Sequence, residues 1–399
     1  MKSFERILLL ISILLYLFLA VFSYSYVDLN LTISQNPLIV NFINSMQRLG
    51  YFHRPQATLI YLIFLILTFL LFIFNLWFFY REKVGVRYLK LSVITSTLIL
   101  IFAYPFLSSD LFNYLFDAKI ILNYHVSPYT HKPQDFIGDD WLRFMRWVHR
   151  YSPYGPIWLG MSLVPAFLGF GKFILNLLFF KIFIALFHLI NAYLIFKILQ
   201  KINPRMALFG TTFYALNPLF LIEGVANAHN DVVLATFIIL SLYFLTISKK
   251  QYVYLSLFLG TLVKYIPILN LPWLLIFSKS KIVDSLPKII LLNLMTMLVF
   301  TYLFSSFKIT VPFVSAGSTQ VQFQPWYLFW SLPLIALLPR ITLIALSIAL
   351  LFGASLRYLP FLFYGDWSHP QTVPFMQIVL FAPLAVLISY LLFREILKR

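Results

Sequence analysis

The sequence predicts an all-α protein that crosses a membrane about twelve times. Hydrophobic residues make up 61% of its 399 residues and charged residues only 11%, whereas a soluble domain is roughly one quarter charged. The mean hydropathy is +0.88. The apolar residues form blocks as long as a bilayer is thick rather than short alternating stretches. This pattern excludes a soluble globule and a transmembrane β-barrel and predicts a polytopic helical protein.

Two further features of the composition narrow the class. The net charge is +17, which in a membrane protein is better explained by basic cytoplasmic loops than by nucleic-acid binding. Cysteine is absent, so a disulfide framework and a thiolate metal site are excluded. The basic segment Met1–Arg6 precedes an apolar block that lacks a small-residue cleavage site, and we interpret this block as an uncleaved first span.

Twelve apolar blocks are candidate spans: 7–25, 57–79, 89–107, 173–199, 206–222, 231–247, 252–264, 267–277, 286–305, 326–339, 341–361 and 375–393. Another stretch, 156–170, is too short for a full span and is broken by Gly169 and Gly171. We therefore expect a half-helix that enters and leaves the membrane on one side, which is tolerated where the segment is buried in protein.

The distribution of charge predicts the orientation. With both termini in the cytoplasm, most Lys and Arg residues between the predicted spans fall on the cytoplasmic side. Most carboxylates then fall outside: Asp28, Asp110, Asp117, Asp135, Asp139, Asp140, Glu223, Asp231 and Asp366. Acidic residues do not set topology, so this skew suggests that the chemistry faces outward. The longest polar stretch, 108–155, lies on that side, and residues 141–150 have the spacing of an interfacial amphipathic helix.

Asp110 is the leading candidate for a catalytic carboxylate. It follows two serines where the third span meets the outer loop, and desolvation at such a boundary raises a carboxyl pKa toward the range useful for a general base. The alternative is that Asp110 only caps a helix. Asp117 follows two helical turns later and can share a face with Asp110. Between two prolines, Tyr154 offers a rigid amphipathic ring for substrate contact, although a plain turn also accounts for the prolines.

The segment 223–231 concentrates polar side chains at a predicted membrane boundary, where they are costly unless used. An N-cap role explains Asn230 or Asp231 but not Glu223, Asn227 and His229 together. Because the segment opens a helix, its backbone N–H groups suit an anionic ligand.

Two cations break the inside-positive pattern. Lys264 lies at the tip of a tight apolar hairpin and Arg357 near the outer end of a span. Binding of a phosphate and snorkelling to the interface are both consistent with each cation. Trp330, in the segment that begins at Gln324, is explained by an aromatic belt. The seven histidines show no zinc-ligand spacing.

Several of these stretches together resemble the GT-C superfamily of membrane glycosyltransferases, and within it the polyprenyl-phosphate-mannose-dependent α-mannosyltransferases. The matching pieces, in order, are Ser-Ser-Asp110 with Tyr114, Ser127-Pro-Tyr129, Ser-Pro-Tyr154-Gly-Pro, Asn217-Pro-Leu, His229-Asn230-Asp231, Lys264-Tyr-Ile-Pro and Pro325-Trp-Tyr. They span the chain from about residue 89 onward.

The resemblance implies a core at 89–399 with an outer catalytic loop at 108–172, preceded by two additional helices in 1–88. It also implies a lipid-linked sugar donor and a catalytic aspartate at Asp110. Many members have two adjacent acidic residues at the loop start, but here Leu111 follows Asp110, which leaves metal participation open.

The predicted function is transfer of a sugar, with mannose as first choice, from a polyprenyl-phosphate donor to a hydroxyl of a cell-envelope glycan or glycolipid. Asp110 would act as base. Substrate would be bound by Asp117, Tyr114, Tyr154, Asn227, His229, Asn230, Asp231, Lys264 and Arg357. No cofactor or nucleic-acid partner is expected, and the enzyme would lie in the plasma membrane with its active site outside. The alternative functions are a flippase or secondary transporter for lipid-linked oligosaccharides and a non-catalytic subunit of an envelope complex.

Overall fold

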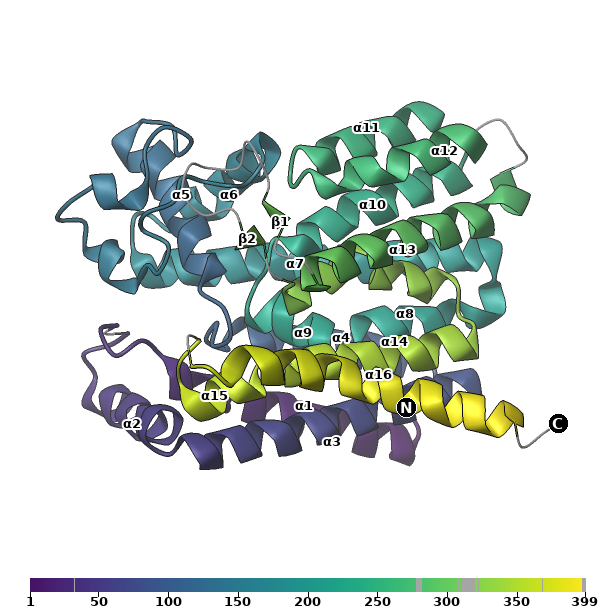
Figure 1. Ribbon diagram of the computed structural model, residues 1–399, viewed down its shortest axis with the longest axis horizontal. Helices are drawn as coiled ribbons and strands as arrows, with labels where there is room; N and C mark the ends of the chain where they lie inside the picture. The colour runs from purple at the N-terminus through teal and green to yellow at the C-terminus, as the bar shows by residue number, and fades with distance from the viewer. Residues whose placement is uncertain are drawn as a thin grey trace.

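The computed structural model describes residues 1–31, 33–277, 282–306, 309–310, 320–321, 323–367 and 369–396. Within these residues the protein is a bundle of helices, most of which run along the long axis of the molecule (Figure 1). The strands there are a two-residue antiparallel pair, β1 (Ile309–Thr310) and β2 (Gln320–Val321). The prediction of an all-α fold class is confirmed in this coarse form.

Five helical segments of the described chain are long and apolar enough to cross a bilayer. They are α1 (Ser3–Ser23) with its extension to Tyr26, α3 (Arg54–Tyr80), α7 (Phe173–Ile202), α14 (Ile341–Leu356) with α15 (Leu359–Tyr364), and α16 (Thr372–Ile396). A sixth is obtained if the segments Pro204–Ala215 and Pro218–Ala226, which meet at 51°, count as one broken span. The structure therefore supports a membrane protein, whereas twelve crossings stay a prediction.

The other helices are shorter: α2 (Pro37–Gln47), α4 (Val86–Ile101), α5 (Asp110–Tyr124), α6 (Pro156–Leu168), α8 (Ala207–Ala215), α9 (Pro218–Leu221), α10 (Asp231–Thr246), α11 (Lys250–Thr261) and α12 (Leu271–Phe277). Helix α13 covers Ile282–Ser306. At 13 residues, α6 is about 20 Å long, less than a bilayer core of roughly 30 Å. Its length agrees with the expected half-helix at 156–170, and its position in a membrane stays a prediction.

Prolines divide two of the predicted spans. The block 206–222 breaks at Asn217, because Pro218 disfavours the helical conformation of the residue before it and lacks an N–H. The expected α-helix over 326–339 is wrong. That stretch consists of two short 3₁₀ turns, Pro325–Trp330 and Leu332–Leu337, each beginning at a proline or just before one.

The amphipathic helix expected over 141–150 is also wrong. Only a 3₁₀ turn, Asp140–Phe144, forms there, with Asp139 accepting a hydrogen bond from the backbone N–H of Trp141 at 2.8 Å. The rings of Trp141 and Phe144 pack on Phe173 at the start of α7, with centroid distances of 5.3 and 4.7 Å. Packing on one aromatic residue, rather than a helical face, therefore orders this part of the loop.

Helix α7 lies at the centre of the bundle and packs against α6, α8 and α10 (Figure 1). By contrast, α16 exposes large apolar side chains, among them Ile378, Val386 and Phe393. Exposure of this kind on a long apolar helix is expected where the solvent is lipid. Helices α5 and α10 both begin near the middle of the bundle, and their first turns define the candidate site.

Candidate active site

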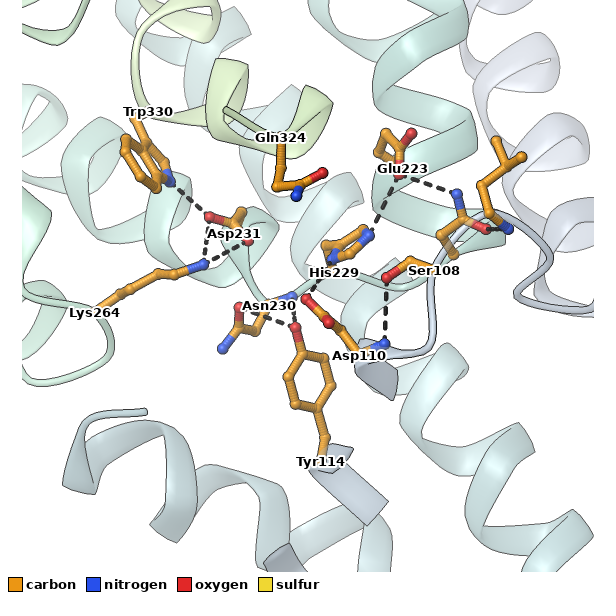
Figure 2. Close-up of polar contacts among 12 residues, drawn as sticks. Ser108, Asp110, Tyr114, Glu223, His229, Asn230, Asp231, Lys264, Gln324 and Trp330 are labelled. Atoms are coloured by element: carbon orange, nitrogen blue, oxygen red, sulfur yellow. Dashed lines mark hydrogen bonds and ion pairs between the residues drawn. The ribbon is translucent and has the colours of Figure 1, made fainter. Parts of the chain in front are cut away.

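Four segments far apart in the sequence meet at one polar site (Figure 2). They are the first turn of α5 with Asp110 and Tyr114, the segment 223–231 before and at the start of α10, the turn after α11 with Lys264, and the 3₁₀ turn Pro325–Trp330. The sequence-predicted candidates from the loop, the polar segment and the hairpin are thus brought together. Their chemical roles are not tested by this placement.

Asp110 is the first residue of α5, and its own backbone N–H donates to Ser108 Oγ at 3.2 Å. Its side chain is 21% exposed. Partial burial raises the pKa of the Asp110 carboxyl, while the electrostatic influence of His229 and Lys264 acts in the opposite direction. Asp110 Oδ2 lies 3.6 Å from His229 Nδ1.

A line of polar contacts continues behind Asp110. The second nitrogen of the His229 imidazole, Nε2, lies 3.3 Å from Glu223 Oε2. The same carboxylate oxygen accepts a hydrogen bond from Asn227 Nδ2 at 3.0 Å, and Asn227 Oδ1 accepts one from the backbone N–H of Leu107 at 3.3 Å. The His229 ring is fully buried and stacks on Trp326, with centroids 3.8 Å apart. We call Asp110, His229 and Glu223 the acid–imidazole–acid line.

A second cluster surrounds Asp231, the first residue of α10. Lys264 Nζ donates to both of its carboxylate oxygens at 2.9 Å, and Trp330 Nε1 donates to Oδ1 at 2.6 Å (Figure 2). The Lys264 ammonium also lies 5.6 Å from the ring centroid of Tyr327, within range of a cation–π interaction. Asp231 is fully buried, but the side chain of Lys264 is 21% exposed. We call Asp231, Lys264 and Trp330 the ion-pair cluster.

Tyr114 joins α5 to the polar segment. Its hydroxyl donates to Asn230 Oδ1 at 3.2 Å. Its ring meets Tyr154 and Trp158 edge-on, each with a centroid distance of 5.0 Å. Tyr154 and Asn230 are both buried, so this wall of the site is aromatic and closed.

Asp117 lies apart from the acid–imidazole–acid line. It is buried beside Ser152, and no contact within the described residues joins it to Asp110. The expected sharing of a helical face therefore does not bring the two carboxylates together. Burial raises the pKa of Asp117 to about 7, with Ser152 partly opposing the shift.

Arg357 approaches from the end of α14. Its Nη1 donates to Gln324 Oε1 at 3.1 Å, and Figure 2 shows Gln324 between the Asp231 and Glu223 carboxylates. Arg357 is 6% exposed. Nothing in the local sequence indicates its contact with Gln324.

Trp330 and Trp326 were not among the predicted site residues, and Glu223 was singled out only as part of the polar segment 223–231. Trp330 is not part of an aromatic belt, since its side chain is 3% exposed and bonded to Asp231. Trp326 holds the His229 ring, and Glu223 closes the line behind it. The Gln-Pro-Trp-Tyr sequence beside a polar segment was the available signal, although nothing local shows which partner each ring meets. In the described part of the chain, no group of three or more His, Asp or Glu side chains is arranged to hold a metal ion.

Comparison with known proteins identifies the family of the chain. The model of the MptA_B family, described as the N-terminal domain of alpha-(1->6)-mannopyranosyltransferase, matches residues 30–280. No curated protein and no solved structure matches the chain. The family match covers more than half of the sequence and includes Asp110, His229 and Lys264. The expected resemblance to mannosyltransferases is thereby confirmed, and the chain belongs to the MptA_B family of alpha-(1->6)-mannopyranosyltransferases.

Proposed function

We propose that this mannosyltransferase moves a mannosyl group from a polyprenyl-phosphate donor to a hydroxyl of a cell-envelope glycan or glycolipid. One observation carries the proposal. Among the charged groups of the two clusters, Asp110 and Lys264 each retain 21% exposure, whereas Glu223, His229 and Asp231 are buried. An accessible carboxylate can act as a general base, and an accessible ammonium can stabilise a leaving phosphate.

In this proposal Asp110 removes the proton of the acceptor hydroxyl. The hydroxyl oxygen forms a bond to the anomeric carbon, and the bond from that carbon to the phosphate oxygen breaks. The bonding pair leaves with polyprenyl phosphate. The raised pKa of Asp110 suits a general base, because a carboxylate with a higher pKa holds the proton more strongly.

Lys264 and Arg357 are proposed to stabilise the charge that develops on the leaving phosphate. Lys264 is a compact cation already oriented by Asp231, so little reorganisation is needed when an anion arrives. Gln324 holds the Arg357 guanidinium in a fixed direction. The buried candidates Asn227, Asn230, Tyr114 and Tyr154 then shape the sugar pocket and hold these groups in place, and Asp117 supports the wall that carries Tyr154.

The proposal also places the site on the outer face of the plasma membrane. Its support is the outward skew of the carboxylates and the accumulation of basic residues between the predicted spans. The apolar surface of α16 contacts membrane lipid in this arrangement. The division into added helices at 1–88 and a core at 89–399 belongs to the same proposal.

The test is transfer of radiolabelled mannose from polyprenyl-phosphate mannose in membranes that contain the full-length protein. The wild type should transfer label, and Asp110→Asn should lower the rate by about 10²- to 10⁴-fold, as expected for loss of a general base. Asp140→Asn, in an exposed position of the same loop, is the matched control and should retain activity. Equal activity of the Asp110→Asn enzyme would overturn the assigned base. Absence of transfer by the wild type from any lipid-linked sugar would overturn the function.

A further inference from the structure

We propose that His229 and Glu223 form a proton relay behind Asp110, in which the imidazole accepts the proton that Asp110 removes from the acceptor. The inference rests on the proposed role of Asp110 and assigns a task to two residues that cannot reach substrate. The His229 side chain has no exposed surface, and Glu223 is 1% exposed. His229 therefore acts through Asp110 as a positioning residue.

The geometry of the ring is the first argument. His229 Nδ1 faces Asp110 Oδ2 at 3.6 Å, and Nε2 faces Glu223 Oε2 at 3.3 Å. Within the described residues neither nitrogen forms a hydrogen bond. An imidazole between two carboxylates can take a proton at one nitrogen while its other N–H stays directed at a negative charge. The Nε2 contact is already within hydrogen-bond distance but is poorly aligned, and hydrogen bonds of a catalytic site often become shorter and better aligned only when substrate is bound.

The fixation of the ring is the second argument. His229 stacks on Trp326 at 3.8 Å with an interplanar angle of 17°, which prevents the imidazole from turning away from the carboxylates. Glu223 is held in turn by Asn227, whose amide oxygen accepts from Leu107 N. Leu107 is three residues before Asp110, so the contacts form a closed circuit from Asp110 through the segment 223–229 and back. A capping role would require none of these side-chain contacts.

The proton balance is complete. The acceptor hydroxyl gives its proton to the Asp110 carboxylate as the glycosidic bond forms and polyprenyl phosphate leaves with the electron pair. Asp110 then passes the proton to His229 Nδ1 and becomes a carboxylate again. The resulting imidazolium is neutralised by Glu223 through Nε2–H. After the products leave, the proton returns through Asp110 to water, and the enzyme is ready for another cycle.

Other charged and titratable groups face this line and must be considered in any pH dependence. Lys264 and Asp231 act on Asp110 from the ion-pair cluster. Arg357 lies on the side of Glu223, together with the hydroxyls of Tyr61 and Tyr358. Substitution of His229 or Glu223 alone leaves all five of these groups in place. Because His229 and Glu223 also act on Asp110 electrostatically, a shift of the pH profile supports the relay only when kcat and the solvent isotope effect change with it.

The experiment measures kcat, KM and the solvent deuterium isotope effect across pH for the full-length protein. The variants are His229→Gln and Glu223→Gln, which keep polar side chains of related size. The relay predicts a loss in kcat of roughly 10²-fold with KM changed less than about twofold, because proton transfer but not substrate contact is lost. The isotope effect and the position of the acid limb of the kcat profile should change in both variants. His188→Gln, at a buried histidine of α7 bonded to Ala215 O at 3.1 Å, controls for the cost of replacing a buried imidazole and should leave the pH profile unchanged.

The outcomes separate the relay from the proposed function. If Asp110→Asn abolishes transfer while His229→Gln and Glu223→Gln keep the wild-type kcat and pH profile, the relay is overturned and the function stands. If the two variants lose activity through KM or thermal stability with an unchanged pH profile, their role is structural and the relay is again overturned. If the wild type transfers no sugar, the proposed function fails before the relay is reached. A coordinated change in kcat, isotope effect and acid limb supports the relay.

Discussion

The two polar clusters of the site draw on one short segment of chain but differ in how tightly they are held. In the acid–imidazole–acid line, the contacts of His229 with its two carboxylates measure 3.6 and 3.3 Å. In the ion-pair cluster, Asp231 accepts hydrogen bonds of 2.9, 2.9 and 2.6 Å. In the first arrangement neither imidazole nitrogen forms a hydrogen bond within the described residues. The second fixes a cation in one place.

The backbone explains how two residues so close in sequence join different clusters. His229 precedes α10, and its N–H donates to Glu223 O at 3.1 Å, which turns the segment back on itself. Ala228 adopts a left-handed conformation with φ of 56° at this turn. Asp231 is already in the helix, so its side chain leaves on another side. A turn followed directly by the start of α10 thus places His229 and Asp231 in different clusters.

The largest expected effect comes from removing the fixed cation. Lys264→Gln leaves Asp231 buried without a counter-charge, which is expected to destabilise the protein by about 3–5 kcal/mol. It should also lower the transfer rate by about 10²- to 10³-fold, through lost stabilisation of the leaving phosphate. Transfer assays and thermal unfolding in detergent measure the two effects.

Lys83→Gln, at an exposed lysine, is the control for that substitution. The double variant Lys264→Gln with Asp231→Asn should recover much of the unfolding temperature but not the activity, because the buried charge is gone while the phosphate remains without its cation. A double variant with normal transfer would show that the ion pair is only structural.

The next effect tests whether the position of the cation matters as well as its charge. A Cβ at Gly155 would lie 2.0 Å from the backbone oxygen of Leu262, so Gly155→Ala must push apart α6 and the turn that carries Lys264. Two backbone hydrogen bonds, Gly155 N to Val263 O and Ile157 N to Leu262 O, would be strained. We expect a loss of transfer of roughly tenfold to a hundredfold, since small misplacements of a catalytic group are costly. A Cβ at Gly160 would meet no atom within 4 Å, so Gly160→Ala should leave the transfer rate unchanged.

Asp117 is a third buried carboxylate and belongs to neither cluster. Its burial predicts how the stability of the protein depends on pH. The pKa of Asp117 is raised by burial to about 7, so the folded protein keeps its proton over a range in which the unfolded chain has lost it. Stability should therefore fall as pH rises from about 4 to 7 and change little above that range.

Asp117→Asn should remove this dependence and raise the unfolding temperature at pH 8 by about 5 °C. Unfolding is followed in detergent from pH 4 to 8. Asp135→Asn, at an exposed carboxylate, should reproduce the wild-type curve. An Asp117→Asn curve that still falls with pH would assign the dependence to another group.

The smallest expected effect measures how much the Trp330 indole contributes to the ion-pair cluster. Trp330→Phe keeps a ring for stacking on Tyr327, at 4.2 Å in the wild type, but removes the N–H that donates to Asp231. Because Lys264 still neutralises Asp231, we expect a loss in kcat/KM of only about fivefold, near the net value of one hydrogen bond of about 1 kcal/mol. A loss as large as that of Lys264→Gln would mean that the indole, and not the ammonium, orients the carboxylate.

The sequence predicted the class of fold and most of the chain segments that form the site. Long apolar blocks required membrane helices, and costly polar residues at their ends drew attention to Asp110, His229, Asp231 and Lys264. These residues lie together in the structure (Figure 2), although their roles stay predictions. Local composition sufficed here because an apolar surrounding makes each polar side chain conspicuous.

The remaining features depend on packing between distant segments, which composition does not encode. Asp117 has the helical spacing to join Asp110 but is drawn instead toward Ser152 and the Tyr154 wall. Trp330 has the composition of a belt residue but meets a carboxylate from α10. The helix expected over 326–339 forms two 3₁₀ turns because Pro325 and Pro333 interrupt it. For Asp117 and Trp330, the contact partner lies far away in the sequence. For 326–339, a proline interrupts the helix that hydrophobicity alone predicts.

The buried side chain of Lys181 connects helix α7, at the centre of the bundle, to the segment before Asp110 and to the segment before His229. Lys181 of α7 donates to the carbonyl oxygen of Ala103, which leads into Asp110, and to that of Ala226 at 2.9 Å, which leads into His229. The Lys181 side chain thus links both chain segments to the same long helix. If α7 tilts or shifts in a thicker or thinner bilayer, we expect these two chain segments to move with it together. The distance from Asp110 to the His229 imidazole would then depend little on the thickness of the surrounding lipid.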